Sequence, residues 1–449
     1  MNTLIKLMKL LKQSIVILLI GFFHHSSFGQ ELKALETKID GYIKPYLEMN
    51  AWSGSIHIYQ NGNPIFQKGY GYADKEWEIK NSLETKFRIA SISKVFTEVA
   101  VLHLVENGEI SLDDTLSQYF LDYPRGNEIS IRQLLTHRSG IPHLNSFPNY
   151  NELNKFAYDL EEIIELFKHK PLDFEPGQRY SYSNSGYVLL AAIIEKVSGL
   201  SYEEFLEVHI YNKIGLRNTG VDSNAKILKN RARGYMFDEY GKLINAEYVD
   251  MSIKIGGGSL YSTADDLHKF VQSLIKGQLL TSTLAELPNF GSTDGAKVFT
   301  ANGRVQGFCH QITHRIEEDL TIIILGNHYS NIALPIAQDI YQIYSDKEYK
   351  IPVNYLARKI DIASNELIKY EGTYDFGFGP VGTVKVIDGN LGYLAPGRKT
   401  YDILVPIDKN KFFYIQSWVI LEFKNPNKES FNTLEWIMGE NAYPAKKIN

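Results

Sequence analysis

The residues best suited to chemistry begin with a serine and a lysine three positions apart, Ser91 and Lys94. Residues three apart on an α-helix lie on one face, so the hydroxyl and the amine can meet. A serine hydroxyl needs a base before it can attack a carbonyl carbon, and a desolvated lysine can be that base. The same spacing recurs at Ser223/Lys226 and Ser273/Lys276. The pair therefore predicts a nucleophile only together with further residues.

A second candidate pair is Tyr182 and Asn184, two positions apart. A tyrosine oxygen can relay the proton of a nucleophile, and an asparagine amide can position both a lysine and a substrate. The same tripeptide pattern recurs at Tyr59 and Tyr329, where core or rim tyrosines are the simpler interpretation. The surroundings distinguish the pair at 182, because Phe174-Glu175-Pro176-Gly177 precedes it and Ser185-Gly186-Tyr187 follows.

Taken in order, four stretches resemble the serine β-lactamase and D-alanyl-D-alanine carboxypeptidase family, in the branch of class C β-lactamases and related esterases. They are Ser91–Lys94, Leu134–Gly140, Phe174–Tyr187 and Gly257–Leu267. The likeness covers about residues 31–345, and the chain after about residue 365 resembles the lipocalin-like β domain often attached to this family. The resemblance implies an α+β fold, with an antiparallel sheet flanked by helices, a mainly helical part and the site between the two.

The resemblance also implies roles for individual residues. Ser91 would be acylated, Lys94 and Tyr182 would share the role of base, and Asn184 would bind substrate. Water would then release the acyl group. The oxyanion hole would use the backbone N–H of Ser91 and one from the strand with the third motif, each such donor being worth about 10²–10³ in rate.

The third motif departs from the family pattern, which has Lys-Thr-Gly or His-x-Gly. Alignment on Gly303 and Gly307-Phe308 puts Ala301 where Lys or His belongs, followed by Asn302. Arg304 would give the backbone donor, and residues 301–304 would line the substrate site. Three explanations stay open. Arg304 or another cation compensates, the substrates lack a carboxylate, or the domain has lost turnover and only binds peptidoglycan-like or peptide ligands.

The elements that must position these residues follow from hydrophobic patterns. Residues 92–106 and 187–198 are apolar nearly all round, which predicts two buried helices. Residues 53–60 and 64–70 flank Asn61-Gly62-Asn63 and predict a hairpin. Further expectations are a helix near 264–276, a central strand at 320–325, a loop over about 140–155 that could line a site, and a plain turn at Gly256–Gly258.

The chain divides into four predicted segments. Residues 1–29 have the basic, apolar and small-residue regions of a secretory signal peptide, with a cut after Gly29. An uncleaved anchor is the weaker interpretation, since the apolar run, 15–23, is far shorter than a span of about 20 residues. Residues 30–350 form the hydrolase domain, 351–366 a connection, and 367–449 an all-β sandwich or barrel. Such a chain is exported, to the periplasm or outside a bacterial cell.

Composition limits the other possibilities. The 449 residues have a formal charge of −5, and loss of the signal segment with its three lysines would lower this by three, to −8. This mild acidity argues against a nucleic-acid partner, because a protein that binds nucleic acid usually has a basic domain or stripe. The lone Cys309 excludes an intrachain disulfide and argues against a cysteine metal site. His310 and His314 read as strand residues, and His137 as a structural hydrogen-bonding residue. No cofactor or metal is expected.

The sequence therefore predicts a secreted serine hydrolase that acts through an acyl-Ser91 intermediate. Its substrate would be a small molecule or peptide: a small ester, a D-amino-acid amide or peptide, or a cell-wall fragment. Ala301 makes efficient β-lactam hydrolysis doubtful. The alternative from another class is a catalytically impaired binding protein on the same fold.

Overall fold

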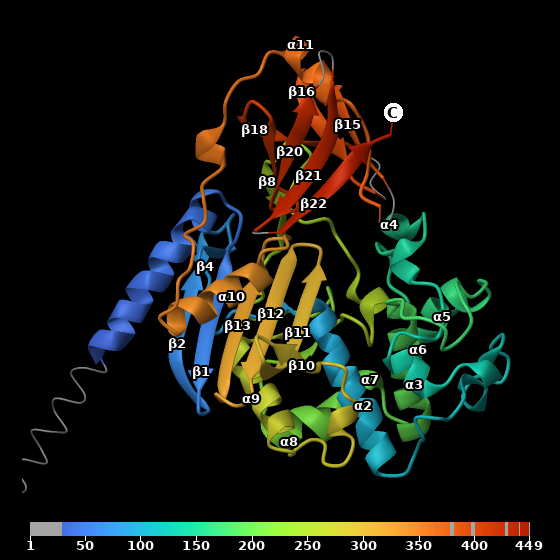
Figure 1. Cartoon of the computed structure of the whole chain (residues 1–449). Helices are drawn as coiled ribbons and strands as arrows, with labels where there is room; N and C mark the ends of the chain where they lie inside the picture. Colours follow the sequence, from blue (N-terminus) through green and yellow to red (C-terminus); the bar gives the residue numbers. More distant parts are fainter. Residues whose placement is uncertain (1–28, 378–380, 397–399, 427–429, 440, 449) are drawn as a thin grey trace, which may run out of the picture.

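An antiparallel six-stranded sheet forms the centre of the molecule (Figure 1). The computed structural model describes residues 29–377, 381–396, 400–426, 430–439 and 441–448. The strands run in the order β10-β11-β12-β13-β1-β2. Their bounds are β10 Phe290–Thr293, β11 Ala296–Val305, β12 Phe308–Arg315, β13 Leu320–Gly326, β1 Gly54–Gln60 and β2 Asn63–Tyr70. The predicted hairpin and central strand are both confirmed.

Alternating side chains give the sheet two buried faces. On one face, Ile56 of β1 and its partner Ile324 of β13 pack under the helix at residues 29–48 and under α10 (Ala333–Tyr344). On the other face, Ile323 and Leu325 join the largest core cluster, which α9 (Ala264–Ile275) shares. The side chain of Thr263 caps α9, and the helix lies where the sequence predicts one, near 264–276.

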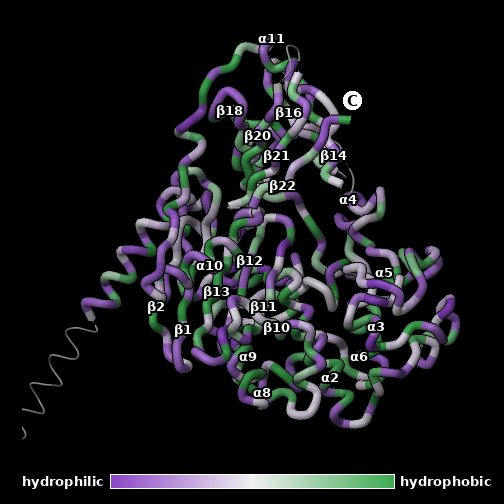
Figure 2. The backbone as a smooth tube through the Cα atoms, viewed as in Figure 1, coloured by the Kyte–Doolittle hydropathy of each residue, from purple (hydrophilic) through white to green (hydrophobic). Residues whose placement is uncertain are grey.

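The helical part surrounds α2 (Ser93–Glu106) and α6 (Asn184–Ser198), the two predicted buried helices. Figure 2 shows apolar chain gathered where these helices lie. The remaining helices here are α3 Ile131–Leu135, α4 Tyr150–Leu153, α5 Leu160–Lys168, α7 Tyr202–Leu206 and α8 Asn212–Ile214. Three short pairings hold the connections: β3 Tyr72–Asp74 with β4 Ile79–Lys80, β5 Phe87–Arg88 and β6 Gly220–Val221 with β9 Leu260–Ser262, and β7 Tyr235–Phe237 with β8 Leu243–Asn245.

The segment expected to be a loop over 140–155 is partly helical. It contains a 3-10 turn, η4 (Leu144–Ser146), and the single turn of α4. Tyr150 begins α4 and is 5% exposed, so burial of its ring holds a turn that sequence periodicity is too short to reveal.

A nine-stranded antiparallel sheet, curled into a nearly closed barrel, follows as the C-terminal unit (Figure 1). Its order is β17-β16-β15-β14-β22-β21-β20-β19-β18. The bounds are β14 Gly372–Asp375, β15 Gly382–Ile387, β16 Asn390–Leu394, β17 Asp402–Ile403, β18 Val405–Asp408, β19 Lys411–Tyr414, β20 Val419–Pro426, β21 Phe431–Met438 and β22 Asn441–Lys447. The expected all-β unit is confirmed. A short helix, α11 (Ser364–Leu367), precedes it.

The barrel docks on the β7–β8 hairpin of the first unit. Phe413 and Ile415 of the barrel pack with Phe237 in a small buried cluster. The Gln416 side chain donates to the backbone oxygens of Phe237 and Asp238, at 3.2 and 2.6 Å. The two units are therefore joined by apolar packing and hydrogen bonds at the β7–β8 hairpin.

The predicted signal segment falls almost wholly on residues 1–28, which lie outside the described residues. Over the part of the chain that the structure describes, none of the helices combines the length and the apolar character needed to cross a bilayer.

Candidate active site

Ser91 and Tyr182 come together at the centre of the predicted site. Ser91 lies in a 3-10 turn, η1 (Ala90–Ile92), directly before α2, and its Oγ is 2.7 Å from the Tyr182 hydroxyl. Ala90 has φ of +50°, a backbone conformation that non-glycine residues adopt rarely and that turns the chain sharply before the serine. The two hydroxyls can therefore exchange a proton directly.

Lys94 lies in the first turn of α2 and is 5% exposed. Its Nζ donates to Oδ1 of Asn184 at 2.7 Å and to the backbone oxygen of Gly257 at 2.5 Å. The amine also lies 4.9 Å from the centre of the Tyr182 ring. A Cβ at Gly257 would come within 3.1 Å of Nζ, so the turn that was expected to be merely structural holds the lysine amine.

Two histidines fasten the segment that contains Tyr182 and Asn184. The backbone N–H of Ser183 donates to Nδ1 of His137 at 3.2 Å, and that of Asn184 donates to Nδ1 of His143 at 3.0 Å. Burial, and then the charge of Lys94, lowers the pKa of His137 to about 3 and that of His143 to about 4. Both rings are therefore neutral acceptors, and His137 is structural as expected.

Strand β11 forms the opposite wall. A Cβ at Gly303 would lie 2.3 Å from the backbone oxygen of Ile89 and 3.1 Å from the backbone nitrogen of Ser91. The strand thus touches the nucleophile turn at Gly303, where the sequence alignment places the motif glycine. Ala301 shares that face and is buried in the main core. Asn302 and Arg304 alternate to the exposed side, and the Arg304 guanidinium donates to Oδ1 of Asn331.

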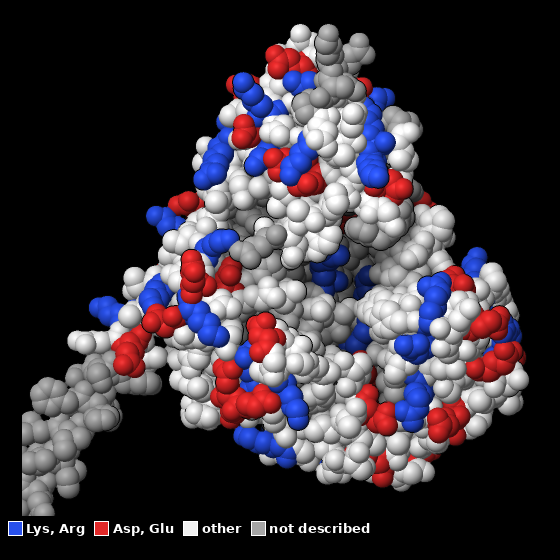
Figure 3. All heavy atoms as spheres, in the orientation of Figure 1, with Lys and Arg blue, Asp and Glu red and all other residues white. Residues whose placement is uncertain are grey.

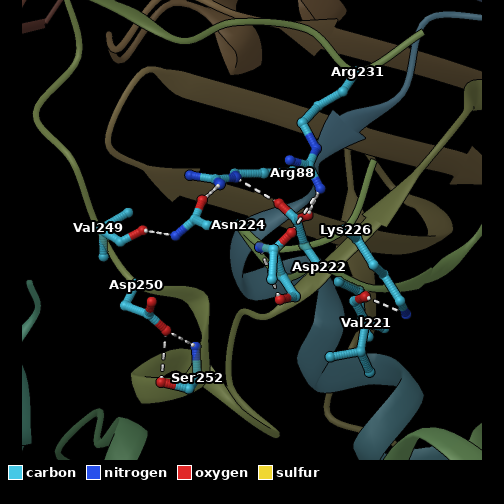
Figure 4. Close-up of polar contacts among 12 residues, drawn as sticks. Arg88, Val221, Asp222, Asn224, Lys226, Arg231, Val249, Asp250 and Ser252 are labelled. Carbon is cyan, nitrogen blue, oxygen red and sulfur yellow. Dashed lines mark hydrogen bonds and ion pairs between the residues drawn. The ribbon is translucent and has the colours of Figure 1, made fainter. Parts of the chain in front are cut away.

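A buried ionic cluster fixes the strand that leads into the nucleophile turn (Figure 4). The carboxylate of Asp222 has no exposed area, and it accepts from Nε of Arg88 and from Arg231, both at 2.6 Å. The backbone oxygen of Arg88 is 2.6 Å from Nε2 of His310. Because Arg88 ends β5 three residues before Ser91, these contacts hold the approach to the turn in place.

The helical wall, which contains Ser91, Lys94, Tyr182 and Asn184, and the strand wall formed by β11 enclose a cleft of about 980 Å³. Figure 3 shows the molecule hollowed below the barrel, with basic side chains in the hollow. The basic residues that line the cleft are Lys94, Arg138 and Arg304, and its one acidic residue among those described is Glu98. All eight predicted site residues line this cleft, namely Ser91, Lys94, Tyr182, Asn184, Ala301, Asn302, Gly303 and Arg304.

Comparison with known proteins matches residues 39–332 to the Beta-lactamase family. The chain belongs to the Beta-lactamase family. It is similar to the Bacillus subtilis protein PbpX, named as a penicillin-binding protein, with 30% identity over 316 residues that cover 68% of this chain and 78% of that protein.

A second relative is the teichoic acid D-alanine hydrolase of Staphylococcus aureus, 28% identical over 253 residues that cover 56% of this chain. This chain spans 62% of that enzyme, somewhat under two thirds. Among solved structures, the octameric penicillin-binding protein homologue of Pyrococcus abyssi matches 92% of this chain and 99% of its own, with a TM-score of 0.61 and 24% identity. The resemblance and the fold class expected from the sequence are confirmed.

Sequence reasoning missed two buried ionisable residues of this Beta-lactamase family member. Glu98 lies one turn after Lys94 and is 3% exposed, and Lys254 is 8% exposed. Burial raises the pKa of Glu98 to about 7, and Oε1 accepts from the Tyr187 hydroxyl at 2.5 Å. The position of Glu98 inside the apolar stretch 92–106 could have marked it as a buried acid. The sequence around Lys254, close to Gly256–Gly258, contains no comparable sign that the lysine is buried.

The remaining expectations concern residues outside the catalytic cluster. Lys226 and Lys276, the lysines of the other two Ser-x-x-Lys pairs, are exposed. Cys309, His310 and His314 all lie on β12 and are buried, which confirms the interpretation as strand residues.

Proposed function

We propose that this protein is a serine hydrolase that forms an acyl-enzyme on Ser91, with Lys94 and Tyr182 as its base. The observation that carries this proposal is the 2.7 Å contact between Ser91 Oγ and the Tyr182 hydroxyl, in a cleft where Lys94 is held by two acceptors. A buried amine beside a phenol whose hydroxyl contacts a serine is an arrangement that supports acyl transfer.

The reaction would proceed in two halves. Ser91 Oγ forms a bond to the substrate carbonyl carbon, while its proton passes to the base made by Tyr182 and Lys94. That proton then goes to the leaving alcohol or amine as the bond to the carbonyl carbon breaks. In the second half, water attacks the acyl carbon, gives its proton to the same base, and the Ser91 oxygen takes a proton back.

The oxyanion would be stabilised by the backbone N–H groups of Ser91 and Arg304. This assignment is supported by the close approach of Gly303 to the Ser91 backbone, which places β11 beside the nucleophile. Donors fixed in place before the reaction stabilise charge as it develops, without reorganisation.

For the substrate, we propose a small ester, a D-amino-acid amide or peptide, or a cell-wall fragment. The basic residues of the cleft support a polar or anionic partner, and the teichoic acid D-alanine hydrolase is a relative whose name states a D-alanyl substrate. Ala301 contributes no charge, so we do not expect efficient β-lactamase activity. Asn184, Asn302 and Arg304 are the proposed polar contacts.

A second candidate function is favoured by one observation. Ala301 is buried in an apolar core, and the Arg304 side chain is turned to Asn331 and lies 5.1 Å from the Tyr329 ring centre. This placement counts against Arg304 as the replacement for the missing cation. A protein that binds peptidoglycan-like or peptide ligands without turnover is the alternative.

We also propose that residues 1–29 export the chain to the periplasm or the cell exterior, that residues 30–350 form the hydrolase domain, and that 351–366 connect it to the β unit at 367–449. Protein sequencing of the mature N-terminus tests the cleavage after Gly29. A chain recovered from cells with Met1 intact and confined to the cytoplasm would contradict export.

One experiment tests the hydrolase directly. The purified protein is incubated with a fluorophosphonate probe and a panel of chromogenic esters, beside Ser91→Ala and the control Ser223→Ala. We expect labelling and turnover in the wild type and the control, and their loss in Ser91→Ala. A wild type without either reaction would favour the binding protein.

A further inference from the structure

Lys254 is a buried charged side chain that the proposed reaction leaves unused. It ends the 3-10 turn η6 (Met251–Lys254), and its amine donates to the Tyr150 hydroxyl and lies 4.8 Å from the centre of that ring. Within the described part of the chain, it forms no ion pair with an acid. Because burying an ammonium group without a counter-ion is unfavourable, fold stability alone gives no reason for a lysine here.

A continuous series of side-chain contacts leads from Lys254 to Lys94. The side chain of Asn145 neighbours the Tyr150 hydroxyl and acts to lower its pKa, against the larger effect of burial. Oδ1 of Asn145 accepts from Nδ2 of Asn184 at 2.9 Å, and Oδ1 of Asn184 accepts from the Lys94 amine at 2.7 Å. Lys254 therefore lies at the far end of the chain of contacts that orients the proposed base.

The backbone joins the same two residues by a second route. The carbonyl oxygen of Lys254 accepts from the N–H groups of Gly257 and Gly258, at 3.1 and 2.7 Å. This closes the turn whose Gly257 oxygen in turn accepts from the Lys94 amine. The position of Lys94 thus depends on Lys254 through both its side chain and its main chain.

Three titratable groups face the Lys254 amine: Lys94 from α2, His143 from the segment before η4, and Tyr150 from α4. His143 is neutral, since its pKa is about 4, and burial raises the pKa of Tyr150, so it is neutral as well. Burial, and then the charge of Lys94, lowers the pKa of Lys254 to about 7. Lys94 is therefore the charged neighbour that, after burial, disfavours a proton on Lys254.

We propose that Lys254 is a positioning residue for acyl transfer at Ser91: it holds the end of the contact series that orients Lys94, and it supplies the second positive charge that Ala301 does not. The inference rests on the proposed function of Ser91, and it adds a group that acts through the base and does not touch the substrate.

The test uses the full chain as wild type, Lys254→Met, Tyr150→Phe, Ser91→Ala and the control Lys276→Met, which changes an exposed lysine. Labelling by a fluorophosphonate is timed from pH 5 to 10, kcat and KM are measured on one chromogenic ester, and thermal unfolding is followed for each variant. Met matches the length of Lys and carries no charge.

We expect Lys254→Met to label about 10- to 100-fold more slowly at pH 7, through kcat and with KM nearly unchanged. The pH dependence of its rate should differ from that of the wild type, because Lys254, whose pKa burial lowers to about 7, no longer titrates beside the site. Its melting temperature should not fall, since an unpaired buried amine is removed. Tyr150→Phe should lower kcat and keep more of the wild-type pH profile, because the Lys254 amine stays while its hydroxyl partner is removed.

Several results would overturn the inference. They are a folded Lys254→Met with the rate and pH profile of the wild type, an equal loss in Lys276→Met, or a loss at every pH accompanied by a lower melting temperature. If the wild type itself does not label, the proposed function fails, and this inference fails with it. Labelling that depends on Ser91 but not on Lys254 leaves the hydrolase standing and removes only Lys254.

Discussion

The two walls of the cleft differ in how closely they follow the family pattern. On the helical wall, Ser91, Lys94, Tyr182 and Asn184 are all present and joined by short hydrogen bonds. On the strand wall, the glycine at 303 is in place against the nucleophile turn, but position 301 has no charge. The contrast separates the groups proposed to make and break the acyl bond from those proposed to recognise the substrate.

The difference has a physical basis. Groups of the helical wall depend on each other, because each loses a partner if its neighbour changes, and an unpaired buried polar group is costly. In the family pattern that the sequence resembles, a cation at position 301 would attract a substrate carboxylate as well as help to hold the base. It can therefore be lost without unfolding the site, and the substrate range changes first.

The largest expected effect breaks the helical wall. Lys94→Met should reduce kcat by about 10²–10⁴-fold, because the amine that shares the base role is removed. The matched control Lys226→Met removes the exposed lysine of another Ser-x-x-Lys pair and should have wild-type activity. Steady-state turnover of a chromogenic ester measures both, and equal rates for the two variants would show that the helical wall does not supply the base.

A slightly smaller effect tests the contact between the walls. Gly303→Ala places a methyl group 2.3 Å from the Ile89 oxygen, so β11 must move away from the Ser91 turn and the oxyanion donors separate. We expect a fall of about 10²–10³ in kcat. Gly291→Ala, in open space on the neighbouring strand β10, is the control. A Gly303→Ala variant with full activity would remove β11 from the proposed oxyanion hole.

Local patterns predicted the parts of this molecule that are local. The spacing of Ser91 and Lys94, the apolar helix after them and the hairpin at Asn61-Gly62 each occupy a few residues, and the structure has all of them. The family resemblance then placed Tyr182 and Gly303 near Ser91, although they lie far apart in the sequence.

The sequence could not predict contacts between residues that lie far apart in the chain and belong to no recognisable motif. Lys254 is linked to the proposed site only because Tyr150 and Asn145 fold back toward it, over more than 100 residues of separation. The helical turn at Tyr150 was missed for the same reason, since tertiary burial of the ring, and not propensity, holds so short a helix.

A moderate effect tests whether a cation at position 301 of the strand wall changes the preference among substrates. Ala301→Lys or Ala301→His restores a cation on the face that Gly303 shares, so it should raise kcat/KM for a carboxylate-bearing substrate several-fold, about 1 kcal/mol, relative to a neutral ester. Parallel assays on a matched pair of esters, with and without the carboxylate, measure this ratio. An unchanged ratio would contradict the role given to the missing cation.

The smallest expected effect is on the pH dependence of the free energy of unfolding, through Glu98 on α2. Burial raises the pKa of Glu98 from its ordinary 4.5 to about 7, so between these values the folded state holds a proton that the unfolded state has lost. The stabilisation from Glu98 is therefore complete below about pH 4.5 and lost as pH rises to 7, by roughly 3 kcal/mol at most. Glu98→Gln cannot ionise and should lack this decline, so its melting temperature relative to wild type should rise by a few degrees from pH 4.5 to 7.

Glu106, the last residue of the same helix, is the matched control of opposite sign. Burial acts to raise its pKa, but backbone hydrogen bonds from Thr283, Thr281 and Ser282 prevail and lower it to about 2. Its stabilisation is present above pH 4.5 and lost as pH falls toward 2. Glu106→Gln should therefore differ from wild type most at neutral pH and least in acid. If Glu98→Gln gave that pattern instead, Glu98 would be ionised in the folded protein, and the stability change expected from its burial would be wrong.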